Sequence, residues 1–136
     1  MNGCVFCEIV AGRARSYKVW EDSDFLAILD VFPKISGQVL LVAKKHLPSY
    51  VFGLTKKEQS AFFGAAAKVG RLMDKKLGTA RTAMRMEGLE VEHAHLKLYP
   101  VYSREDYGRN VNNVPQRVKS EELEIIYKKF LKGGEN

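Results

Sequence analysis

The stretch VEHAHLKLYP, residues 91–100, alternates polar and apolar side chains around two histidines. In a β-strand, side chains two positions apart project from the same face of the sheet. The alternation therefore predicts a strand with His93, His95 and Lys97 on one face and apolar side chains on the other. Two imidazoles and an ammonium group make a poor core surface, so this face is expected to bind an anion or to carry out chemistry.

The rest of the chain has the composition of an ordinary globular protein. It has 136 residues, of which 46% are hydrophobic and 28% are charged, and this length favours a single domain over residues 1–136. No apolar run approaches the roughly 20 residues that cross a bilayer. The first residues, MNGCVFC, also lack the basic and apolar segments of a secretory signal. We therefore expect a cytoplasmic protein that makes no contact with a membrane.

The formal net charge of +6 favours ligands that carry phosphate, because the field of a basic protein attracts anions. The lysines and arginines are spread along the chain without a block of five or six. This distribution argues against sequence-specific nucleic-acid binding, and we expect a small anionic ligand instead.

Cys4 and Cys7 are the only cysteines, and their Cys-x-x-Cys spacing indicates half of a metal site or a redox pair. A redox motif normally follows a strand, and no strand precedes Cys4. Zinc prefers four nitrogen and sulfur ligands, which both cysteines, His46 and one of His93 or His95 would supply. The residues alone leave open two reduced thiols, a surface His46, and strand histidines that bind a carboxylate or the backbone.

Sequence periodicity predicts both strands and helices along the chain. Strands are expected at residues 17–20, 24–31, 38–43 and 79–86, and the last of these should form a hairpin with the histidine strand. A long helix should span residues 55–77, from a capping box of Thr55 and Glu58 to a stop at Gly78. A helical turn is expected at residues 8–12, and a last helix from Ser120 should fray at residues 133–134. Residues 101–115 show no clear period.

Four separated segments carry a resemblance to a known family: CVFCEIVAG (4–12), FLAILDV (25–31), GQVLLVAKKH (37–46) and GLEVEHAHLK (88–97). In this order and spacing they resemble the histidine triad (HIT) family of nucleotide hydrolases and transferases. The resemblance covers residues 4–100 and leaves residues 101–136 as a C-terminal extension with a helix. It implies an α+β fold with an antiparallel sheet of about five strands, one long helix and the C-terminal helix, and a homodimer in which the two sheets join.

The resemblance also implies a role for each residue of the site. The middle histidine of the family's triad attacks the α-phosphate of a small-molecule nucleotide substrate and forms a nucleotidyl intermediate; this position is His95. Structural zinc would be held by Cys4, Cys7, His46 and His93. Asp30 would bind the ribose, Gly88 would contact the phosphate, and the base would lie in an apolar cleft formed by Val5, Phe6, Ile9, Ile28 and Val31.

Several positions depart from the family pattern, among them Gln38, Ala43 and the region of Thr82, and two bear directly on the phosphate. Lys97 replaces the third histidine, and Leu89 replaces a glutamine that contacts phosphate. A lysine holds a phosphate well, but with an ordinary pKa of about 10.4 it is a poor proton shuttle unless burial lowers that value. Three hypotheses follow: a nucleotide hydrolase or nucleotidyl transferase in which His95 and Lys97 act, a nucleotide-binding protein with little turnover, and a zinc-stabilised interaction module without a nucleotide.

Overall fold

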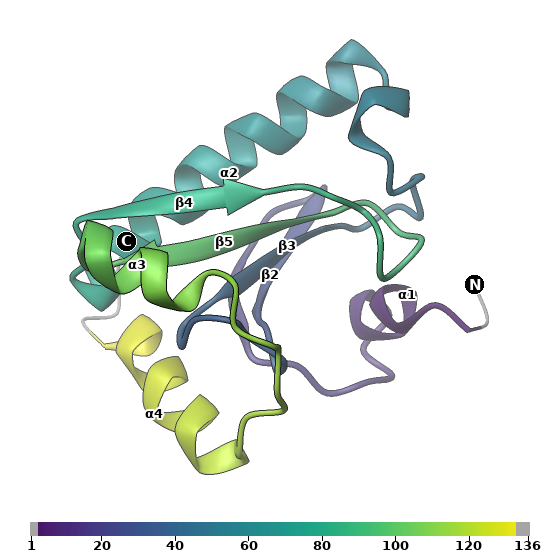
Figure 1. Ribbon diagram of the computed structural model, residues 1–136. Helices are drawn as coiled ribbons and strands as arrows, with labels where there is room; N and C mark the ends of the chain where they lie inside the picture. The colour runs from purple at the N-terminus through teal and green to yellow at the C-terminus, as the bar shows by residue number, and fades with distance from the viewer. Residues whose placement is uncertain (1–2, 133–136) are drawn as a thin grey trace.

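The computed structural model describes residues 3–132 of the chain. Within these residues it contains a five-stranded antiparallel sheet, which confirms the predicted α+β fold (Figure 1). The strands, in the spatial order β1-β2-β3-β5-β4, are β1 (Lys18–Glu21), β2 (Phe25–Leu29), β3 (Val39–Ala43), β5 (His95–Val101) and β4 (Arg81–Arg85). The helices are α1 (Val5–Val10), the 3₁₀ helix η1 (Val51–Gly53), α2 (Lys56–Leu77), α3 (Arg104–Asn110) and α4 (Ser120–Leu131).

Both faces of the sheet are covered, as the doubly apolar sequences of β2 and β3 require. Every residue of these two strands is buried, and successive side chains alternate between two hydrophobic clusters. One cluster lies between the sheet and the helices α2 and α4, and the other lies under α1 (Figure 1). The face under α1 also carries His95, because Leu96 and Leu98 of β5 point into the first cluster. The site is therefore enclosed by α1 and separated from the main core by the sheet.

Helix α2 follows the sequence prediction closely. Thr55 accepts a hydrogen bond from the amide of Glu58, whose side chain accepts one in return from the Thr55 amide, so the capping box is complete. Gly78 ends the helix with φ of 71°, a left-handed conformation that glycine adopts without strain. Phe62 and Met73 lie in the main core and fix the helix on the sheet.

The histidine strand is shorter than predicted. β5 begins at His95, so residues 86–94 form a long connection from β4 instead of a short hairpin turn, although β4 and β5 do pair antiparallel. This connection is tied to the segment before η1, because the Ser49 hydroxyl donates to the Gly88 carbonyl at 2.9 Å. The Ser49 amide also donates to Glu92 at 3.1 Å. Tertiary hydrogen bonds thus replace the strand ladder that the alternating sequence favours.

Two helices also differ from the prediction. α1 begins at Val5, earlier than the expected turn at residues 8–12, because the Cys4 sulfur caps it by accepting a hydrogen bond from the Cys7 amide. α3 was not predicted, since it is short and polar and its cap, Ser103, accepts from the amide of Asp106. The expected fraying at residues 133–134 lies outside the described residues.

No helix within residues 3–132 is both long and apolar enough to cross a membrane.

Candidate functional site

Four side chains from three separate segments converge where α1 meets the sheet. Cys4 and Cys7 come from the start of α1, His46 from the segment after β3, and His93 from the residues just before β5. One sulfur or nitrogen atom of each lies within 4.8 Å of the other three. His93 Nδ1 is 3.3 Å from the Cys4 sulfur and 3.1 Å from His46 Nδ1, which is itself 3.2 Å from the Cys7 sulfur.

These separations fit a tetrahedral metal site. A zinc ion bound at about 2.3 Å to sulfur and about 2.0 Å to nitrogen holds its ligand atoms roughly 3.3–3.8 Å apart. His93 is prepared for this role, because its Nε2–H donates to the Ala43 carbonyl at 2.6 Å and leaves the Nδ1 lone pair facing the cluster. Burial lowers the pKa of His93, which favours the neutral form that binds metals. His93, rather than His95, therefore completes the ligand set that the sequence left open.

His95 is held with one ring nitrogen available. The side chain is 3% exposed, and its Nδ1–H donates to the backbone carbonyl of His93 at 2.7 Å. This bond fixes the tautomer, so Nε2 carries the lone pair, and no hydrogen-bond partner for Nε2 occurs among residues 3–132. The ring of Phe6 lies against both histidines, with centroid distances of 5.6 Å to His93 and 5.0 Å to His95. His93 has left the predicted strand but still faces the same side as His95.

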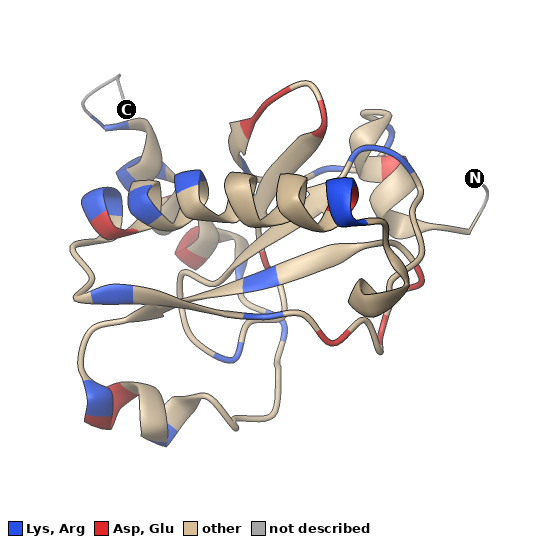
Figure 2. Cartoon of the chain, turned by 90° about the horizontal axis from the view of Figure 1, so that it is seen from above, with Lys and Arg blue, Asp and Glu red and all other residues tan. Residues whose placement is uncertain are grey.

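Lys97 is a largely buried cation that is already paired. Its side chain is only 12% exposed, and Nζ lies 3.1 and 3.2 Å from the two carboxylate oxygens of Glu90 and 3.6 Å from Glu87. Burial by itself lowers the pKa of Lys97, but the neighbouring carboxylates outweigh it, and the pKa lies above its usual value. Both glutamates belong to the acidic connection between β4 and β5, which is marked in red in Figure 2. Two carboxylates therefore favour the charged form of Lys97 near neutral pH.

His95 and Lys97 open onto a cavity of about 540 Å³ between α1 and the sheet. Eight of the residues singled out in the sequence line it: Val5, Phe6, Ile9, Ile28, Asp30, Val31, His95 and Lys97. Gly88 does not line it. Its φ of 71° and its close approach to Ser49, where an added Cβ would overlap the Ser49 carbonyl, give it a backbone role in the connection.

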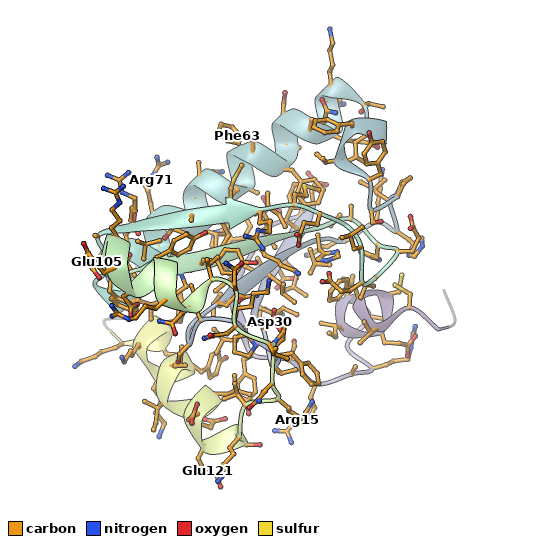
Figure 3. All side chains as sticks on the ribbon, in the orientation of Figure 1. Arg15, Asp30, Phe63, Arg71, Glu105 and Glu121 are labelled. Carbon is orange, nitrogen blue, oxygen red and sulfur yellow. The ribbon has the colours of Figure 1, made fainter. Side chains whose placement is uncertain are left out.

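Asp30 lies near the centre of Figure 3, at the end of β2, and is held there by two donors. The amide of Phe32 and the side-chain nitrogen of Gln38 each donate to one carboxylate oxygen at 2.8 Å. Gln38 is 2% exposed and also accepts from the Lys34 amide, so it positions Asp30 rigidly. Burial raises the pKa of Asp30 despite these donors. Each carboxylate oxygen keeps a lone pair that a ligand hydroxyl can use.

The chain is similar to known proteins in sequence and in fold. Residues 11–104 match the model of the HIT domain family. This chain belongs to the HIT family. An uncharacterized HIT-like protein of Mycoplasma genitalium is 30% identical over 131 residues, which cover 92% of each chain.

Several solved structures are also similar to this HIT-family chain, among them two histidine triad proteins. A hypothetical histidine triad nucleotide-binding protein from Sulfolobus tokodaii superposes with a TM-score of 0.78 at 21% identity, over 93% of this chain and 89% of its own. A zinc-bound histidine triad family protein from Mycobacterium smegmatis gives a TM-score of 0.68 at 25% identity, over 94% and 93% of the two chains. The first likeness supports the fold, and the second concerns a relative that holds zinc.

Several residues of the HIT-family cavity were missed by the sequence analysis. Arg15 and Ser16 precede β1, Glu90 lies in the connection before β5, and Arg117 comes from the segment before α4. None of them stands in a periodic element, and Arg117 is far from the others in sequence. Only the tertiary fold brings them to one cavity, so no local signal could have identified them.

Proposed function

We propose that this HIT-family protein binds a nucleotide in the cavity and acts on its α-phosphate, as a hydrolase or nucleotidyl transferase. The observation that carries the proposal is the geometry of His95. This buried imidazole lines the cavity, and the hydrogen bond at Nδ1 fixes its tautomer so that Nε2 keeps a free lone pair. Substrates of this class are nucleoside phosphoramidates and dinucleoside polyphosphates.

The proposed reaction proceeds in two steps. The Nε2 lone pair of His95 attacks the α-phosphorus, a P–N bond forms, and the bond to the leaving group breaks with its electron pair going to the leaving group. Water or another acceptor then attacks the phosphorus, and the P–N electron pair returns to the imidazole. Lys97 holds a non-bridging oxygen of the phosphate, and Asp30 accepts hydrogen bonds from the ribose hydroxyls. The apolar residues of α1 and β2 enclose the base.

The test compares wild-type protein with His95→Ala, using adenosine phosphoramidate and diadenosine polyphosphates as substrates. We expect the variant to lose turnover by at least a hundredfold while it still binds AMP, because its cavity wall is otherwise intact. A nucleotidyl group trapped on wild-type protein, and absent from the variant, would support the covalent step. Turnover that does not depend on His95 would refute the mechanism.

A second candidate function is nucleotide binding with little or no catalysis. The pairing of Lys97 with Glu90 favours it, since the phosphate must compete with a carboxylate for the cation. This candidate predicts that AMP binds with a measurable heat while both substrate classes remain uncleaved by the wild-type protein.

We also propose that Cys4, Cys7, His46 and His93 hold a structural zinc ion. The convergence of their ligand atoms, all within 4.8 Å of one another, and the zinc-bound relative from Mycobacterium smegmatis support this assignment. The ion would join α1 to the segment after β3, which carries His46, and to the segment before β5, which carries His93. It would thereby stabilise the cavity wall. Elemental measurement on protein purified without chelator should give one zinc per chain, and Cys7→Ser should reduce both the zinc content and the unfolding temperature. Full zinc content in that variant would contradict the assignment.

Finally, we propose a cytoplasmic homodimer that forms through β4. This strand is an edge of the sheet, and edge strands present unpaired backbone groups to a partner. Met84 on β4 is 50% exposed, and Phe63, labelled on α2 in Figure 3, is 64% exposed. Both residues line a groove between α2 and β4. Light scattering should give twice the chain mass for the wild type and a monomer for Met84→Lys. A monomeric wild type would refute the proposal.

A further inference from the structure

The cavity has two ends that differ in their side chains. Strand register places Lys97 opposite Leu40 and Leu40 opposite Ile28, so these three residues form one row across the sheet. Asp30 lies beyond this row at the end of β2, and the chain continues from it through Val31 to Phe32. The end of the cavity near Phe32 therefore lies beyond Asp30, away from the row that contains Lys97, the residue proposed to hold the phosphate.

Two arginines and a serine stand at this second end. Arg15 and Ser16 come from the segment between α1 and β1, and Figure 3 shows Arg15 on the side of Asp30 that is nearer to the start of α4. Arg117 is brought to the cavity because the next residue, Val118, donates its amide hydrogen to the Val31 carbonyl at 2.9 Å. All three residues line the same cavity as the apolar side chains of α1.

Both guanidinium groups are available to a ligand. Neither Arg15 nor Arg117 forms an ion pair within residues 3–132, whereas nearby Arg13 is paired with Glu8 at 2.9 Å. The guanidinium carbon of Arg117 lies 5.6 Å from the ring centre of Phe32, a cation–π contact that orients the group without using its N–H donors. A planar group with five donors and no acceptor is thus held at the rim of an apolar cleft.

Guanine and adenine differ in the hydrogen-bonding groups that they present to an arginine at the rim of the cavity. Guanine presents two adjacent acceptors, N7 and O6, which match the paired donors of a guanidinium group. Adenine presents the N7 acceptor beside the N6 amino donor, so the same group makes one hydrogen bond and faces a like donor. We infer that this cavity selects guanine, or another 6-oxopurine, over adenine, and that Arg117 with Arg15 determines the selection.

This inference rests on the proposed function, because the proposed binding mode places the base against α1 and β2. It is tested by calorimetric titration of the whole protein with GMP, IMP, AMP and 7-deaza-GMP. These ligands carry the same phosphate, so differences between them report on the base alone. We expect GMP and IMP to bind about fivefold more tightly than AMP. This factor lies at the lower end of the range for base discrimination by a bidentate arginine, because both arginines are exposed to water. 7-Deaza-GMP should lose most of this advantage.

Variants then assign the selection to residues. Arg117→Lys keeps the charge but loses the paired donors, so it should reduce the preference to about twofold, and adding Arg15→Lys should abolish it. Arg104→Lys, an exposed replacement on α3 outside the cavity lining, is the matched control and should retain the wild-type preference. Unfolding curves of each variant verify that the fold is unchanged.

The outcomes separate the two proposals. Equal binding of GMP and AMP by the wild type would overturn the base inference and leave nucleotide binding intact. A guanine preference that survives both arginine replacements would also overturn it, because the base would then be read elsewhere. Failure of every nucleotide to bind would overturn the proposed function and this inference with it.

Discussion

Replacing Glu90 with glutamine should strengthen nucleotide binding. The Glu90 carboxylate lies at 3.1 and 3.2 Å from Lys97 Nζ and lines the cavity beside His95. It therefore occupies the partner position that a ligand phosphate would take at Lys97. The amide of glutamine keeps a similar shape but removes the charge, so the phosphate no longer competes with the closer of the two carboxylates, and only the longer contact of Lys97 with Glu87 at 3.6 Å remains.

The size of this effect follows from the exposure of the pair. Glu90 is 59% exposed, so its contact with Lys97 is screened by water and contributes about 0.2–1 kcal/mol, as exposed ion pairs do. Releasing Lys97 should lower the Kd of a nucleoside monophosphate by up to about fivefold. Like-charge repulsion between Glu90 and the phosphate adds to this gain at low salt. The gain should shrink as salt is raised, because screening weakens both terms.

Calorimetric titration of a nucleoside monophosphate at low and high salt measures this prediction. Glu124→Gln on α4 makes the same change in net charge at an exposed position outside the cavity lining, and it should leave the Kd unchanged. A nucleoside without phosphate should bind wild type and Glu90→Gln equally. Weaker or equal phosphate binding by Glu90→Gln, or an equal gain in Glu124→Gln, would show that Glu90 does not compete for Lys97.

Four other predictions follow from single groups in the structure. Lys97→His should raise turnover of a phosphoramidate at least tenfold relative to that of a dinucleoside polyphosphate, because an imidazole can give the amine leaving group a proton; steady-state kinetics with an unchanged ratio would contradict this. Gly88→Ala should cost more than about 2 kcal/mol in a urea titration, from the left-handed φ and the overlap with the backbone. The control Gly12→Ala, which also has a positive φ but no atom nearby, should cost only about 1 kcal/mol. Tyr99→Phe should stabilise the protein by up to about 1 kcal/mol, since the buried hydroxyl has no hydrogen-bond partner among the described residues; a loss of stability in thermal unfolding would show that it has one. Finally, because the folded-state pKa of Asp30 is raised, the folded state holds its proton more tightly and stability should fall as pH rises from the ordinary aspartate pKa through the raised one. Asp30→Asn should remove that slope, although loss of the charge accepting from the Gln38 amide lowers its overall stability.

The elements with strong local signals were predicted correctly. α2 carries its own start and stop signals in Thr55, Glu58 and Gly78, and the apolar runs at residues 24–31 and 38–43 contain β2 and β3. The predicted start of β5 was wrong. Alternation of side chains at residues 91–94 indicates which side chains are buried, but it does not indicate which backbone groups pair with a neighbouring strand. There the Ala94 amide donates to the Leu47 carbonyl, and Ser49 donates to the Glu92 side chain and to the Gly88 carbonyl.

The candidate site was predictable only in part. Histidines and cysteines are rare enough in this chain that a four-ligand set could be drawn up, and the resemblance then chose His93 over His95. The pairing of Lys97 with Glu90 was not foreseen, although burial of a lysine at that position was considered. Lowering of the Lys97 pKa by burial was named only as the condition for proton transfer, and the carboxylates on a connection without periodicity raise that pKa instead. A periodic sequence pattern does not predict which charged side chains on loops will pair with a residue of the site.

His93 joins the two parts of the site through its backbone and its side chain. The imidazole supplies Nδ1 to the Cys4, Cys7 and His46 cluster, while the carbonyl of the same residue accepts the Nδ1–H of His95. Because His93 lies outside the strand, no sheet ladder fixes that carbonyl, and the side-chain anchors of His93 must hold it instead. One anchor is the ligand cluster, and the other is the Ala43 carbonyl, which accepts the Nε2–H at 2.6 Å. A displacement of His93 would therefore remove the hydrogen bond that fixes the His95 tautomer, even if the residues that line the cavity did not move. The cluster acts on the proposed nucleophile by positioning it, and this explains why two histidines with separate roles are placed only two residues apart.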